Sequence, residues 1–139
     1  MRYLLFVSHG TLASGMTQAL GMLVGEREDV RQVAFQDGMA LPAFQEEIEK
    51  VIAPMTRSDE IIVLADLVSG SPLTTTMAAI SEQLGLANVL AIGGMNLPMA
   101  VTYVEEEDSP LDEAVASMMA CGAEQVKQFS TNADSEDDI

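Results

Sequence analysis

One histidine and one aspartate in this sequence stand where a nucleophile and its orienting partner would stand. His9 is the only histidine of the chain, and it follows closely on the apolar run Tyr3–Val7. Asp66 directly follows a second apolar run, Ile61–Ala65. A carboxylate beside an imidazole accepts one ring N–H, fixes the tautomer and leaves the other ring nitrogen free as a nucleophile. Such a pair supports nucleophilic chemistry on histidine.

The residues that follow Asp66 could hold an anion beside this pair. The loop Ser69–Pro72 leads into an apolar-periodic stretch, which predicts Ser71 as the N-cap and Pro72 as the first helical position. The unpaired backbone N–H groups at a helix start favour an anion. A histidine nucleophile, an orienting carboxylate and an anion site together describe phosphoryl transfer through phosphohistidine.

Each of these residues also has a structural interpretation. A lone histidine after a strand is more often a hydrogen-bonded structural residue, and Asp66 could simply cap the next helix. Ser71 would start a helix whatever else it does. The acidic run Glu105–Asp108 is interpreted as a solvated turn, and Cys121 with His9 cannot supply three zinc ligands, so neither a metal nor a cofactor is expected.

Four short apolar runs alternate with amphipathic stretches along the chain. This pattern predicts an α/β fold, a doubly wound, mostly parallel four-stranded sheet with helices on both faces. Its first and third strands are commonly neighbours, which would bring His9 and Asp66 together at their carboxyl ends. Gln125–Phe129 is predicted to add a short edge strand. The predicted strands are Tyr3–Val7, Val30–Phe35, Ile61–Ala65 and Val89–Ile92; helix boundaries are expected at Gly25, Gly85, Asn96, Ser109 and Gly122.

Length and charge exclude several classes of function. The 139 residues suit one domain, predicted over 1–130, with an acidic flexible tail at 131–139. Six Lys and Arg against 22 Asp and Glu give a charge of −16, which argues against binding nucleic acid or an anionic membrane surface. Apolar runs are too short for membrane insertion or secretion, and the single Cys121 fits a cytoplasmic, reducing setting.

Taken together, the motifs resemble a known family. Ser8-His9-Gly10, Asp66 with Gly70-Ser71-Pro72, and the segment 96–99 (Asn-Leu-Pro-Met) are similar to those of the IIA component of the mannose–fructose–sorbose family. That family belongs to the bacterial phosphoenolpyruvate:sugar phosphotransferase system (PTS). The resemblance covers the chain from Arg2 to Phe129.

The resemblance implies a role for each matching residue. His9 would accept a phosphoryl group from the phosphocarrier HPr and pass it to the IIB component, with the membrane components IIC and IID downstream. Asp66 would hydrogen-bond the histidine, and Gly70 and Ser71 would contact the phosphoryl group. Members form homodimers in which the last strand crosses to the partner, which here corresponds to Gln125–Phe129.

Two departures from the family accompany this interpretation, of which Ser8 in place of the Thr of some members is a small one, and three alternatives stand beside it. Leu67, Val68 and Ser69 stand where members often carry Trp and a second Gly, which bears on partner specificity more than on phosphoryl transfer. A histidine phosphatase is rejected, because Ser8 stands in place of the required Arg and no second His exists. The phosphorelay subunit of dihydroxyacetone kinase, and a non-catalytic regulatory domain of the same fold, remain alternatives.

Overall fold

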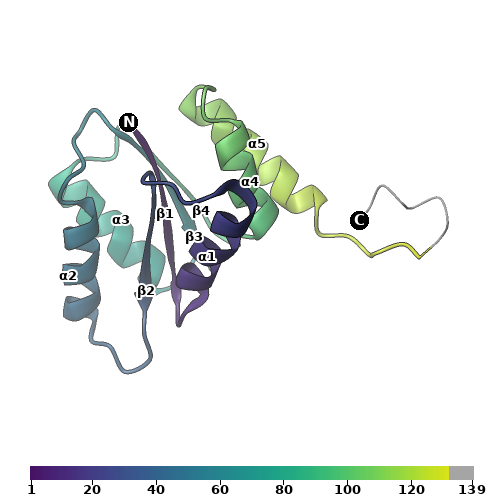
Figure 1. Ribbon diagram of the computed structural model, residues 1–139. Helices are drawn as coiled ribbons and strands as arrows, with labels where there is room; N and C mark the ends of the chain where they lie inside the picture. The colour runs from purple at the N-terminus through teal and green to yellow at the C-terminus, as the bar shows by residue number, and fades with distance from the viewer. Residues whose placement is uncertain (132–139) are drawn as a thin grey trace.

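The computed structural model describes residues 1–131, in which strands and helices alternate up to the last two helices, which follow one another (Figure 1). The predicted acidic tail lies outside these residues except for Thr131. The elements are β1 (Arg2–His9), α1 (Leu12–Val24), β2 (Val30–Phe35), α2 (Leu41–Ile52), β3 (Glu60–Ala65), α3 (Ser71–Gln83), β4 (Val89–Ile92), α4 (Leu97–Glu105) and α5 (Leu111–Glu124).

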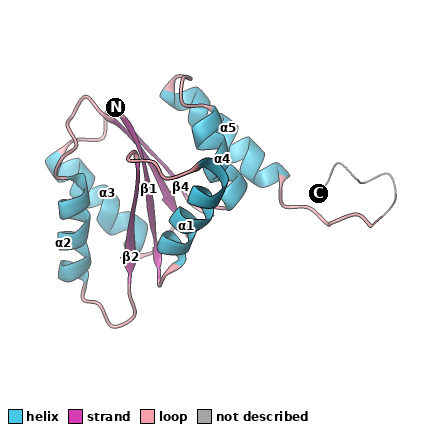
Figure 2. Ribbon diagram, viewed as in Figure 1, coloured by secondary structure: helices cyan, strands magenta, loops and turns pink. Residues whose placement is uncertain are grey.

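The four strands form one parallel sheet in the order β2-β1-β3-β4. The predicted doubly wound α/β fold is therefore confirmed, including the placement of the first strand beside the third. Figure 2 shows the strands between two layers of helices, with α2 and α3 on one side and α1, α4 and α5 on the other.

The apolar runs of β1 and β3 form the core because both of their faces are covered. Leu5 and Val63 pack with residues of α2 and α3 on one face, whereas Phe6 and Leu64 pack with residues of α1, α4 and α5 on the other. All four side chains are fully buried. Continuous apolar sequence is typical of strands that lack a solvent face, so the absence of alternation has a direct physical cause.

Three helix boundaries differ from the prediction by one or two residues. Gly70, not Ser71, is the N-cap of α3, because its φ of 121° makes a turn that only glycine adopts easily. Pro110, not Ser109, caps α5, since its ψ of 149° is still extended. Gly122 does not end α5, which continues to Glu124; an added Cβ there would lie 2.9 Å from Met99 Cε, so glycine permits close helix packing.

Residues 125–131 form no strand within this single chain. Helix α5 ends at Glu124, and residues 126–131 have neither helix nor strand and project away from the body of the protein (Figure 1). Val126 and Phe129 are exposed. The edge strand predicted over Gln125–Phe129 therefore stays a prediction that requires a second chain.

A polar network joins α4 to the amino ends of β1 and β2. The Tyr103 hydroxyl lies 2.8 Å from Asp29 Oδ2 and 3.1 Å from the Arg2 carbonyl, and Arg27 also donates to Asp29. Burial raises the pKa of Tyr103 and the hydrogen bond to Asp29 raises it further, so the hydroxyl remains protonated and donates. The network lies at the amino ends of the strands, so it is at the opposite end of the sheet from His9 and Asp66.

Replacing Tyr103 with Phe should measure how much this network stabilises the fold. We expect the free energy of unfolding, measured by urea denaturation, to fall by about 1–2 kcal/mol, because a buried hydrogen bond to a charged group is lost. Tyr3→Phe is the matched control: Tyr3 is also buried, and its hydroxyl makes no hydrogen bond within residues 1–131. Equal losses in the two variants would contradict the assigned role.

Candidate functional site

His9 and Asp66 meet at the carboxyl ends of β1 and β3. His9 Nδ1 lies 2.8 Å from Asp66 Oδ2, and the His9 backbone N–H donates to the same oxygen at 3.0 Å. The other carboxylate oxygen, Oδ1, accepts from the Leu67 backbone N–H at 2.9 Å. Both oxygens are engaged by donors, so the carboxylate is fixed relative to the ring.

The electrostatics of Asp66 favour its ionised form. Partial burial alone would raise the pKa of Asp66, but hydrogen bonds from the His9 backbone, the His9 ring and the Leu67 backbone outweigh it and hold that pKa below its ordinary value. An ionised carboxylate that accepts from Nδ1 selects the tautomer with its proton on Nδ1. Nε2 then carries the free electron pair.

The tight turn after β1 fixes the backbone of His9. The buried Ser8 hydroxyl accepts from the Ala13 backbone N–H at 2.7 Å, which ties the end of β1 to the first turn of α1. Gly10 adopts a φ of 57° and donates to the Phe35 carbonyl at 2.9 Å. The Phe35 ring lies 6.4 Å from the imidazole, centroid to centroid. Sequence reasoning missed the roles of Ser8 and Phe35; polar Ser8 at the end of an apolar run was the available signal.

Gly70 and Ser71 open α3 beside the imidazole. A Cβ added to Gly70 would lie 3.3 Å from His9 Cε1 and 3.7 Å from Nε2, so the backbone of this residue passes close to the free nitrogen. Ser71 follows as the first residue of α3 and is half-buried. The structure brings Asp66 to Nδ1, as the sequence predicts, and Gly70 to the other side of the ring; the contact of Gly70 and Ser71 with a phosphoryl group stays a prediction. An anion on Nε2 would face the N-terminus of α3.

Asn96 serves the fold and makes no contact with His9 within residues 1–131. Its side-chain oxygen accepts from the Met99 backbone N–H at 3.1 Å, which confirms the predicted cap of α4. Its amide donates to the Gly122 carbonyl of α5 at 2.8 Å. Asn96 therefore joins the loop after β4 to the end of α5.

The site is an open surface. The His9 side chain is 48% exposed, and Leu67 and Val68, which follow Asp66 in the loop after β3, are exposed as well. Two depressions of about 690 and 490 Å³ lie near the amino ends of β1 and β2 instead, and neither includes His9. In the described part of the chain, no group of three or more His, Cys, Asp and Glu is placed to hold a metal ion. Over the same residues, no helix combines the length and apolar composition that crossing a bilayer needs.

Comparisons with known proteins identify one family. The family described as PTS system fructose IIA component matches residues 3–119. The mannose-specific EIIAB component of Escherichia coli K12 is 29% identical over 122 residues; these cover 86% of this chain but only 37% of that longer protein. The sorbose-specific EIIA component of Klebsiella pneumoniae is 30% identical over 107 residues, 77% of this chain and 76% of that one.

A solved structure agrees with this result. The crystal structure of phosphotransferase system component EIIA from Streptococcus agalactiae superposes with a TM-score of 0.81 at 25% identity, and the match covers 95% of this chain and 100% of that one. The similarity therefore extends over the whole sheet and its helices.

Asp66→Asn should disturb the tautomer of His9 without unfolding the protein. An asparagine has one acceptor oxygen, whereas both Asp66 oxygens accept from N–H groups, so one set of donors loses its partner. We expect ¹⁵N NMR of the single histidine to show Nδ1–H in the wild type and a mixture of tautomers in the variant. An unchanged ring spectrum would contradict the role of Asp66.

The stabilising effect of Asp66 should disappear in acid. Its pKa is lowered in the folded state from the ordinary 3.8, so its contribution is present above about pH 4 and is lost as the pH falls through the lowered value. We expect Asp66→Asn to reduce the free energy of urea unfolding at pH 7 and to have less effect near pH 3. If the difference in unfolding free energy between the wild type and Asp66→Asn grew as the pH fell, the ionised form of Asp66 would not be the stabilising one.

Proposed function

We propose that this chain, which belongs to the family of PTS system fructose IIA components, carries phosphoryl groups on His9. As a member it takes part in phosphoryl transfer within the sugar phosphotransferase system. The finer assignment to His9 rests on one observation: Asp66 engages Nδ1, and the His9 side chain, whose other nitrogen is Nε2, is half-exposed at the end of β1.

The transfer step follows from this geometry. Nε2 of the neutral imidazole attacks the phosphorus of a phosphohistidine donor; a new N–P bond forms while the donor N–P bond breaks, and the donor nitrogen leaves with its electron pair. The Nδ1 proton stays between the His9 ring and Asp66, which stabilises the positive charge that develops on the ring. Reversal of the same step with a second protein would unload the site.

The exposed site suits exchange between proteins. A loose phosphoryl-transfer transition state needs in-line approach and charge neutralisation more than covalent assistance. His9 is open to an in-line approach because its side chain is half-exposed, and it lines neither of the two depressions described above. Small, open contact surfaces are common among transient partners.

Charge at the site argues against hydrolysis of phosphoesters. Arg2, Arg27 and Arg31 lie at or just before the amino ends of β1 and β2, far from His9 along the strands. Arg2 and Arg27 are already paired with Glu60 and Asp29, respectively. The backbone start of α3, with Gly70 and Ser71, is then the element that would face the phosphoryl oxygens.

The partners follow from the family resemblance. We assign HPr as the phosphoryl donor and a IIB component as the acceptor, with IIC and IID acting later at the membrane and the IIA domain itself, residues 1–130, in the cytoplasm. The net charge of −16 would hasten encounter with basic surfaces on these partners. Because relatives are named for mannose, sorbose and fructose, which are all hexoses, we propose a hexose as the substrate class of the complete system.

Phosphorylation by phosphoenolpyruvate, enzyme I and HPr tests the carrier function. We expect intact mass spectrometry to show one added phosphoryl group on the wild type and none on His9→Ala, with the phosphate labile in acid and stable in base. Asp66→Asn should be phosphorylated roughly ten- to hundredfold more slowly, because the ring loses its orientation. If the wild type stayed unlabelled while HPr was fully phosphorylated, this function would be contradicted. The partners of dihydroxyacetone kinase would then be tested as donors.

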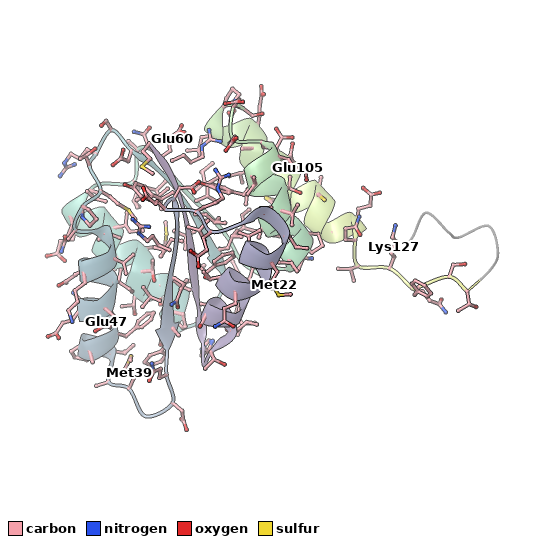
Figure 3. All side chains as sticks on the ribbon, in the orientation of Figure 1. Met22, Met39, Glu47, Glu60, Glu105 and Lys127 are labelled. Atoms are coloured by element: carbon pink, nitrogen blue, oxygen red, sulfur yellow. The ribbon has the colours of Figure 1, made fainter. Side chains whose placement is uncertain are left out.

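We also propose a homodimer in which the C-terminal segment crosses to the partner. Strand β4 is the last in the sheet order, and Leu90 and Ala91 are exposed on it. Val126 and Phe129 are exposed on a segment that leaves the body of its own chain, on which Figure 3 labels Lys127. An open sheet edge and an exposed apolar segment are complementary if a second chain supplies one of them.

Two truncations separate this dimer from other modes of association. A chain ending at Ser130 should remain dimeric by light scattering at micromolar concentration, whereas a chain ending at Gln125 should be monomeric because it lacks Val126 and Phe129. A monomeric full-length chain, or a dimer that survives truncation at Gln125, would contradict strand exchange.

A further inference from the structure

The loop that follows Asp66 packs against the end of β4, where Gly93 lies close to the backbone of Val68. Gly93 directly follows β4, and a Cβ built on it would lie 2.5 Å from the Val68 backbone nitrogen and 2.6 Å from Val68 Cα. Ordinary contact begins at 3.4 Å, so the added atom would lie about 0.9 Å too close to backbone, which cannot rotate away as a side chain can. Only glycine fits at position 93 while the loop keeps its place.

The end of β4 cannot yield to relieve such a contact. The Gly94 backbone N–H donates to the Asp66 carbonyl at 3.1 Å, and the Met95 N–H donates to the Ala65 carbonyl at 3.0 Å. Further along, the Asn96 amide is bonded to the Gly122 carbonyl of α5. The segment after β4 is therefore fixed to the end of β3 and to the Asp66 carbonyl on one side, and to α5 on the other.

The loop itself can yield. Residues 67–70 are all exposed, and Val68 is 75% exposed, so an outward shift would meet solvent and would leave the buried core in place. The shift would act on His9 from two sides. Asp66 lies two residues before Val68 and holds Nδ1, while Gly70 lies two residues after it and passes beside Nε2.

We propose that Gly93 is a positioning residue for phosphoryl transfer, which keeps the 66–70 loop seated so that Asp66 and Gly70 hold the His9 ring. Gly93 touches neither the ring nor the phosphoryl group and acts through the backbone of Val68. The inference rests on the proposed function of His9. A displacement of about 1 Å in a group that orients a reacting atom is enough to reduce a rate roughly a hundredfold.

Gly93→Ala tests the proposal, with Gly21→Ala as the matched control. Gly21 lies within α1, and a Cβ added there meets no atom within 4 Å, so the control adds the same methyl group without a contact. We expect Gly93→Ala to fold, to be phosphorylated roughly ten- to hundredfold more slowly, and to lose the Nδ1–H preference in ¹⁵N NMR of its single histidine. Gly21→Ala should match the wild type in rate and tautomer.

A double variant shows whether Gly93 acts through the orientation that Asp66 gives the His9 ring. In the Asp66→Asn background, Gly93→Ala should slow phosphorylation much less than it does in the wild type, because the orientation of the ring is already lost. Full additivity of the two effects would overturn the proposal. A Gly93→Ala protein with wild-type tautomer and rate would also overturn it, as would one that fails to fold, since Gly93 would then serve the core.

The two proposals fail in different ways. If charged HPr leaves the wild type unphosphorylated, the carrier function fails, but the tautomer of His9 in Gly93→Ala still reports on the loop. If the wild type is phosphorylated and Gly93→Ala is equally fast with an unchanged ring, the carrier function stands and the role of Gly93 fails.

Discussion

The hydrogen bond between His9 Nδ1 and Asp66 is the interaction on which the site depends. It exists because β1 and β3 are adjacent parallel strands whose carboxyl ends meet at one edge of the sheet. The bond takes one nitrogen out of the chemistry and leaves Nε2 as the nucleophile on a half-exposed side chain. A sheet of another strand order would separate the two residues, although each would still follow an apolar strand.

Several parts of the structure keep that bond in place. Asp66 accepts three N–H donors, two from His9 and one from Leu67, so its carboxylate has little freedom. Ser8 ties the end of β1 to α1, and the backbone after β4 is bonded to the end of β3. The histidine can then be exposed to protein partners while the groups that orient it are fixed by the sheet.

The sequence predicts the sheet well and the loops less well, for identifiable reasons. Continuous apolar runs such as Ile61–Ala65 indicate strands buried on both faces. The polar residue that ends such a run, here Asp66, can then be placed at the carboxyl end of its strand. The one-residue shift of the α3 cap to Gly70 depends on a positive φ, which serine-proline patterns do not reveal. The roles of Gly93 and Gly122 depend on contacts between segments far apart in sequence, and no local pattern encodes such contacts.

The position of the phosphoryl group on the ring is the most direct test of this account. Protein labelled with ¹⁵N and phosphorylated from phosphoenolpyruvate can be examined by ¹⁵N and ³¹P NMR, and its single histidine makes the assignment unambiguous. Because Nδ1 is engaged by Asp66, phosphorus should be bonded to Nε2 alone, with Nδ1 still protonated. Phosphorus on Nδ1 would mean that the hydrogen bond to Asp66 does not direct the reaction.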